Sequence, residues 1–111
     1  MYVMGSVDKN DGKTPYAVTV KEVPVDAFWS ITVYNAEGYL EANDLGVNSY
    51  NDSSVKKNKD GSTTIHFGGC EVGRVNCIPI TKGWNYAIRM YKPRKEILDG
   101  SWIFPAIEPL E

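Results

Sequence analysis

Apolar and polar residues alternate along several short segments of the chain, and turn-forming residues separate these segments at intervals of about ten residues. The segments are rich in Val, Ile, Thr, Tyr and Trp, which favour β-strands. Evenly spaced short strands are typical of antiparallel sandwiches and barrels. We therefore expect an all-β fold, a single antiparallel β-sandwich with at most one short helix near residues 93–98.

Residues 28–34 and 84–91 give the clearest strand patterns. Side chains alternate between the two sides of a strand, so each segment should turn one apolar side toward the core. The expected inner sides carry Trp29, Ile31 and Val33, and Trp84, Tyr86, Ile88 and Met90. The expected outer sides mix aromatic, hydroxyl and charged groups: Phe28, Ser30, Thr32 and Tyr34, and Asn85, Ala87, Arg89 and Tyr91.

Two turn sequences predict β-hairpins. In residues 34–39, Gly38 stands where a turn requires a positive φ angle. In residues 57–62, the pair Asp60-Gly61 is typical of a type I′ turn, and an alternating strand follows it. The chain contains no repeat or linker, so we expect one domain over residues 1–111.

Composition and charge narrow the function classes. The 111 residues are 42% hydrophobic and 23% charged, as in globular proteins. The net charge of −2 and the mixing of both signs disfavour nucleic-acid binding, which requires a basic field. No apolar stretch reaches the roughly 20 residues of a membrane helix, and residues 1–5 do not resemble a signal peptide, although a longer exported precursor stays open.

Cys70 and Cys77 are the only cysteines, and two interpretations of them stay open. They form a disulfide if their Cα atoms lie within about 7 Å, or they are two free thiols. A disulfide would indicate a periplasmic or secreted protein, and free thiols a cytoplasmic one. Together with His66, the cysteines match no four-ligand zinc pattern, so we expect neither a metal nor a cofactor.

The expected outer face offers a candidate binding site at Tyr34, Asn85, Arg89 and Tyr91. Aromatic rings beside hydrogen-bonding groups can hold a small organic molecule or a sugar. The alternative is that this face packs on loops, on a neighbouring domain or on a second subunit. No serine stands in a nucleophile elbow, and most carboxylates lie at predicted turns, which disfavours catalysis.

Four strings resemble, in the same order, the motifs of the bacterial family called domain of unknown function 1214. They are residues 23–34, Asp60-Gly61-Ser62, Asn76-Cys77-Ile78-Pro79 before Gly83-Trp84, and Arg89-Met90-Tyr91 leading to Asp99-Gly100-Ser101-Trp102. The resemblance implies a jelly-roll-like sandwich that forms the C-terminal part of a larger protein, behind another β-rich domain. Many members of the family have Trp at the position of Cys77. The resemblance supplies no biochemical role.

We therefore expect a non-catalytic sandwich module that packs on a neighbouring β-rich domain or on a second copy of itself. Two alternatives remain. One is a small-ligand or carbohydrate-binding domain that uses the outer face. The other is part of a hydrolase or lyase whose remaining residues lie in an upstream domain.

Overall fold

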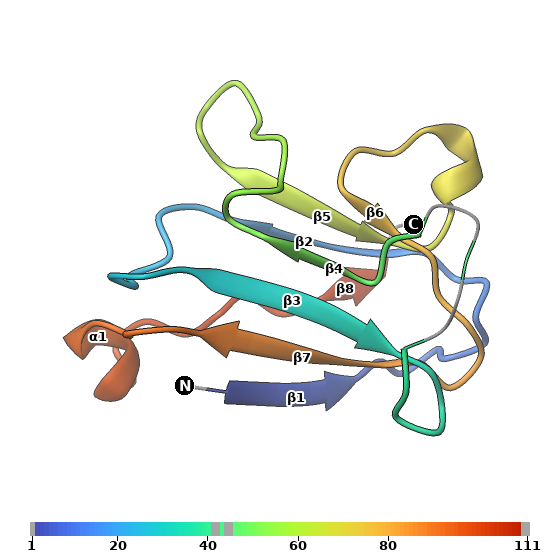
Figure 1. Ribbon diagram of the computed structural model, residues 1–111, viewed down its shortest axis with the longest axis horizontal. Coiled ribbons are helices and arrows are strands. Elements are labelled where there is room, and N and C mark those ends of the chain that lie inside the picture. Colours follow the sequence, from blue (N-terminus) through green and yellow to red (C-terminus); the bar gives the residue numbers. More distant parts are fainter. Residues whose placement is uncertain (1, 41–42, 44–45, 110–111) are drawn as a thin grey trace.

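The computed structural model describes residues 2–40, 43 and 46–109, and almost all of the regular elements in this part of the chain are strands (Figure 1). The strands are β1 (Tyr2–Ser6), β2 (Tyr16–Val20), β3 (Trp29–Tyr34), β4 (Ser49–Asn51), β5 (Thr63–Phe67), β6 (Cys77–Ile78), β7 (Asn85–Met90) and β8 (Glu108–Pro109). A 3₁₀ turn, η1 (Cys70–Val72), and one helical turn, α1 (Lys95–Leu98), complete the described elements. The short helix lies where the sequence predicts it.

The strands form two sheets that pack face to face (Figure 1). Sheet A has the order β1-β7-β3-β4, and sheet B has the order β6-β5-β2-β8. The described pairs are antiparallel, except that β6 runs parallel to β5. The connection between these two strands contains η1. The predicted all-β sandwich is confirmed.

The core lies between the inner faces of the two sheets. Sheet A contributes the predicted apolar side of β3, where Trp29, Ile31 and Val33 are buried. Trp84, just before β7, is completely buried and stacks on Phe67 of sheet B with 5.3 Å between ring centroids. The two-residue alternation predicted for β3 and β7 is therefore confirmed.

The prediction of a type I′ hairpin at Asp60-Gly61 is wrong. Such a turn needs positive φ at both central residues, and here Gly61 has φ 88° while Asp60 does not adopt the left-handed conformation. The strand that follows, β5, pairs with β2 and β6 rather than with the segment before the turn. The chain crosses here from sheet A to sheet B, so the turn joins two layers instead of two paired strands.

The turn after β3 forms as predicted, with Gly38 at φ 88° and a hydrogen bond of 2.7 Å from the Asn35 amide to the Tyr39 carbonyl. It does not close a tight hairpin, because the partner strand β4 begins only at Ser49. Neither helical segment in the described part of the chain has the length or apolar character needed to cross a membrane.

Candidate functional site

The outer face of sheet A carries the candidate site residues. Strands β3 and β7 pair so that Ser30 lies opposite Arg89, Thr32 opposite Ala87 and Tyr34 opposite Asn85. All these side chains point away from the core, because the residues between them point into it. Sequence periodicity thus places the candidate residues on one face, although it gives none of their contacts.

Tyr34 and Arg89 are joined across this face. The Arg89 guanidinium donates a hydrogen bond of 3.0 Å to the Tyr34 hydroxyl. The pair Thr32–Ala87 lies between them in the register, so the two long side chains meet over it. Thr32 is 8% exposed and Ala87 is completely buried. The Tyr34–Arg89 pair therefore covers the middle of the face.

Asn85 is engaged with the backbone at the end of the same face. Its side-chain amide donates a hydrogen bond of 3.0 Å to the Asn35 carbonyl. The Asn35 side chain in turn accepts hydrogen bonds from the amides of Glu37 and Tyr39. Asn85 thus ties the start of β7 to the turn that follows β3, which is a structural role.

Tyr91 forms an exposed aromatic stack with Phe28 at the other end of the face. The ring centroids are 4.3 Å apart with an interplanar angle of 29°, and the Tyr91 amide donates to the Phe28 carbonyl at 2.8 Å. Phe28 remains 42% exposed and Tyr91 41% exposed. The strand pattern places both rings on this side, but it does not predict that they stack.

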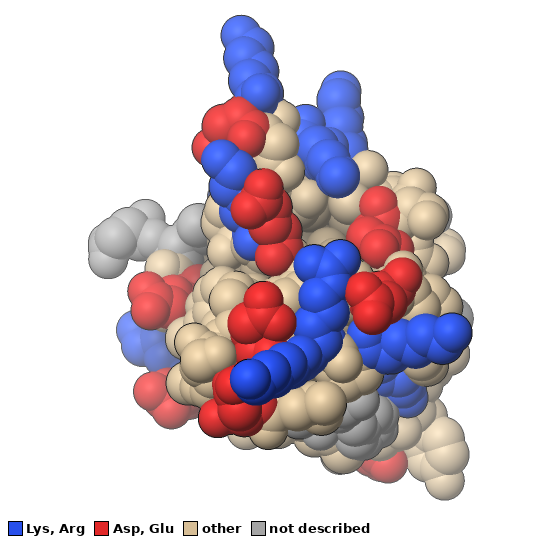
Figure 2. Space-filling model, turned by 90° about the vertical axis from the view of Figure 1, so that its left-hand side faces the viewer, with Lys and Arg blue, Asp and Glu red and all other residues tan. Residues whose placement is uncertain are grey.

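Charges of both signs are mixed on the side of the molecule that carries α1 and the connection between β2 and β3 (Figure 2). The basic segment of residues 92–95 lies here, and Arg94 forms an ion pair of 2.8 Å with Asp26. Both side chains are more than half exposed. This side therefore presents no continuous basic field of the kind that binds phosphates.

Three carboxylates stabilise turns and have lowered pKa values. Each accepts hydrogen bonds from groups two or three residues further along the chain, which favours the charged form and lowers the pKa. The pairs are Asp11 with Thr14, Asp60 with Ser62 and Asp99 with Ser101. All three carboxylates are solvent-exposed, so these shifts reflect turn geometry.

A polar hollow of about 170 Å³ lies at one end of the sandwich. Glu22, Asp52 and Lys57 are among the residues that line it. Among the described residues, the buried Oδ1 atom of Asp52 has no hydrogen-bond partner. Glu22 and Asp52 are therefore the two carboxylates at this hollow that a hydrolase or lyase hypothesis would use.

Cys70 and Cys77 are joined by a disulfide, with Cα atoms 5.6 Å apart. The bond links η1 to β6 and closes a loop over residues 71–76. His66 lies beside this loop on the outer side of β5, where its Nδ1 atom donates to the Val75 carbonyl at 2.7 Å. Because both sulfurs are bonded, they are not available as metal ligands.

Removing this disulfide should destabilise the chain moderately. Closing so short a loop restricts the unfolded chain and stabilises the fold by about 2.5 kcal/mol. We expect the double variant Cys70→Ser/Cys77→Ser to lose about that amount in urea denaturation followed by circular dichroism. The reduced wild-type protein is the control and should lose the same amount. Unchanged stability in both would contradict a stabilising role for the bond.

The comparisons with known proteins agree with this architecture. A model of the family described as "Protein of unknown function (DUF1214)" matches residues 1–95. A search of curated proteins gives no match. The crystal structure of the VPA0106 protein from Vibrio parahaemolyticus is similar, with a TM-score of 0.85 and 28% sequence identity.

The similarity to VPA0106 covers 99% of this chain and 30% of that chain. This chain therefore spans less than a third of the length of the longer protein. The family model covers most of the chain, and the resemblance carried by its motifs points to the same family. The chain belongs to the DUF1214 family.

Proposed function

We propose that this chain is a non-catalytic β-sandwich module that docks through the outer face of sheet A on a neighbouring β-rich domain or on a second copy of itself. The observation that carries the proposal is the exposed Phe28–Tyr91 stack. Met4 lies on the same face, opposite Ala87, and is 60% exposed. Aromatic residues and methionine are enriched at protein interfaces.

The aromatic stack is suited to docking because it is already ordered. Each ring holds the other in place, so a partner that covers them removes apolar area from water without immobilising free side chains. The longer Vibrio parahaemolyticus chain supports the proposal further, because a sandwich similar to this one there belongs to a chain with additional polypeptide. We also propose that residues 1–111 form a single domain.

The polar groups of the face favour docking over sugar binding. A sugar would require free donors and acceptors beside the rings. Arg89 already donates to Tyr34, and Asn85 donates to the Asn35 backbone. Small-ligand or carbohydrate binding at Tyr34, Asn85, Arg89 and Tyr91 therefore stays a second prediction, which requires that these hydrogen bonds exchange for bonds to the ligand.

The disulfide supports a periplasmic or secreted location, since oxidising compartments preserve such bonds. Thiol titration of the protein, isolated from its native cells under conditions that block exchange, tests this proposal. Two bonded cysteines support it, and two free thiols argue for the cytoplasm.

Sedimentation equilibrium of the purified chain tests docking. With the face uncovered, we expect association as the protein concentration rises. The variant Phe28→Ser/Tyr91→Ser should associate at least tenfold more weakly, a change of about 1.4 kcal/mol. Val72→Ser is the matched control, because Val72 is 69% exposed but lies in η1, and it should behave as the wild type.

Two results would count against the proposal. The first is a wild-type chain that stays monomeric over the whole concentration range, which would contradict docking on a second copy. The second is equal weakening by the control and by the aromatic variant, which would show that general surface hydrophobicity causes the association.

A further inference from the structure

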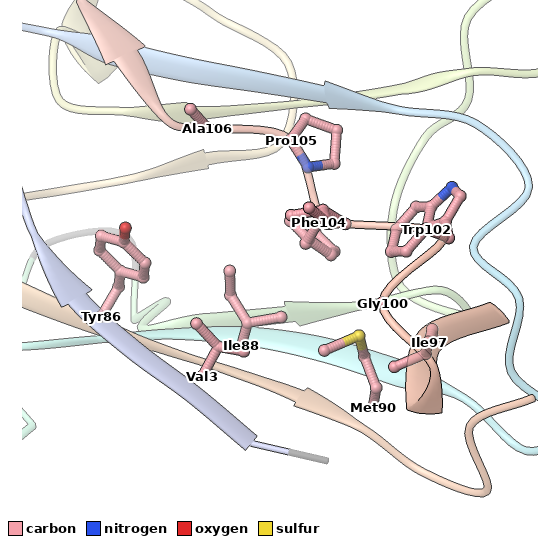
Figure 3. Close-up of a pocket in the computed structure, with 11 residues that line it drawn as sticks. Val3, Tyr86, Ile88, Met90, Ile97, Gly100, Trp102, Phe104, Pro105 and Ala106 are labelled. Carbon is pink, nitrogen blue, oxygen red and sulfur yellow. The ribbon is translucent and has the colours of Figure 1, made fainter. Parts of the chain in front are cut away.

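An apolar hollow of about 250 Å³ opens between the sheets on the side where β1 and the chain before β8 do not pair (Figure 3). Ile88 and Met90 of β7 form one wall, and Trp102 and Phe104 form the opposite wall (Figure 3). Val3 of the edge strand β1 contributes to the rim. Among the described residues that line the hollow, none is charged.

The hollow exists because the chain after α1 crosses from one sheet toward the other without filling the space beneath it. Gly100, at φ 81°, turns the chain there, and Ile103 points outward with 79% exposure. At the other end of β7 the corresponding space is filled by the buried Trp84. The hollow is therefore an opening at the edge of the core, with the buried side chains of Ile88 and Met90 at its base.

Tyr86 supplies a polar group at one end of this hollow, while Ile97 lies at the other (Figure 3). The Tyr86 ring lies over Gly5, which is its register partner on β1. A Cβ added at Gly5 would stand only 2.7 Å from the Tyr86 ring carbon Cζ. Among the described residues, the Tyr86 hydroxyl makes no hydrogen bond. Burial raises the pKa of this hydroxyl, so it stays protonated and able to donate.

We propose that the hollow binds a small uncharged aromatic molecule that carries one hydroxyl or carbonyl group, and that this group hydrogen-bonds to Tyr86. An apolar cavity of about 150 Å³ can hold benzene, so about 250 Å³ leaves room for two fused rings. The aromatic walls match a flat ring. No charged side chain among the described lining residues would offset the cost of desolvating an ionised ligand, so the hollow favours an uncharged one.

Three probes of similar shape test the site by isothermal titration and by amide chemical-shift mapping of the purified chain. We expect 2-naphthol to bind about fivefold more tightly than naphthalene, because it gains one hydrogen bond of about 1 kcal/mol. The anion 2-naphthoate should not bind. The shifted amides should lie in β7 and residues 100–106. Equal binding of all three probes, or shifts elsewhere, would overturn the site.

Two variants separate the hydrogen bond from the cavity. Tyr86→Phe should abolish the preference for 2-naphthol over naphthalene and leave naphthalene binding unchanged, while Tyr39→Phe in the exposed turn should change neither. Val3→Trp should fill the mouth of the hollow and weaken both ligands more than tenfold, while Val72→Trp should not. If Tyr86→Phe keeps the preference, the assignment of Tyr86 is wrong.

The other candidate occupant of the hollow is a side chain from a second copy of the chain. In that case the affinity for 2-naphthol would fall as the protein concentration rises, and that result would overturn the small-molecule site. Docking through Phe28 and Tyr91 is measured independently, because Phe28→Ser/Tyr91→Ser should leave 2-naphthol binding intact.

Discussion

Trp84→Ala should lower the free energy of unfolding by about 3–5 kcal/mol, the usual cost of removing a buried aromatic side chain. Trp84 is completely buried, stacks on Phe67 and meets the edge of the Tyr16 ring with centroids 6.0 Å apart. Among the described residues its indole nitrogen has no hydrogen-bond partner, so the loss comes from packing alone. Such a loss is a large part of the total stability of a small domain.

Urea denaturation followed by circular dichroism measures this effect. Trp102→Ala is the control, because Trp102 is only half-buried at the wall of the apolar hollow and should cost clearly less. Trp84→Phe keeps a ring against Phe67 and should recover part of the stability. A loss below about 1 kcal/mol for Trp84→Ala would contradict its place in the core between the sheets.

Asn76→Ala should cost about 3 kcal/mol, because the Asn76 side chain joins two segments through three hydrogen bonds of about 1 kcal/mol each. The side-chain oxygen accepts from the Lys56 amide at 2.8 Å, and the side-chain nitrogen donates to the carbonyls of Lys56 and Thr64. Asn76 is 7% exposed, so its side-chain amide is largely shielded from water. The same denaturation experiment measures the loss.

The backbone of Asn76 contributes separately, since its φ of 48° suits Asn or Gly better than Ala. Asn76→Gly should therefore be less destabilising than Asn76→Ala by about 1 kcal/mol, although it removes the same hydrogen bonds. If both variants were as stable as the wild type, the bridge between residue 56 and β5 would carry no stability.

The sequence predicts the parts of the fold that depend on local alternation. Trp29, Ile31 and Val33 alternate with polar residues, and the structure buries them as expected. Asp60-Gly61 misleads because hairpin formation depends on where the following strand finds its partner. Strand β5 pairs with β2, whose residues precede it by more than forty positions, and no local signal specifies such a distant partner.

The candidate site was only partly predictable for the same reason. Strand periodicity places Tyr34, Asn85, Arg89 and Tyr91 on one face. It does not reveal that Tyr34 meets Arg89, because this contact depends on the register between two strands that are far apart in sequence. The role of Asn76 was also missed, although it belongs to one of the family motifs, since its partners lie in another segment.

The apolar hollow has no signal in the sequence that we could recognise. It depends on the path of residues 100–106 between the sheets. This segment forms neither a helix nor a strand, so its sequence shows no periodic pattern from which the path could be predicted. Gly5 offers one retrospective indication. A glycine within a strand often marks a close approach by another group, and here that group is the Tyr86 ring.

Oxidative footprinting of side chains at low and high protein concentration tests the docking face most directly. Phe28, Tyr91 and Met4 should become protected as the chain associates, while Tyr39, which is 71% exposed at a turn, should react equally at both concentrations. Association with unchanged oxidation of Phe28 and Tyr91 would contradict docking through the outer face of sheet A.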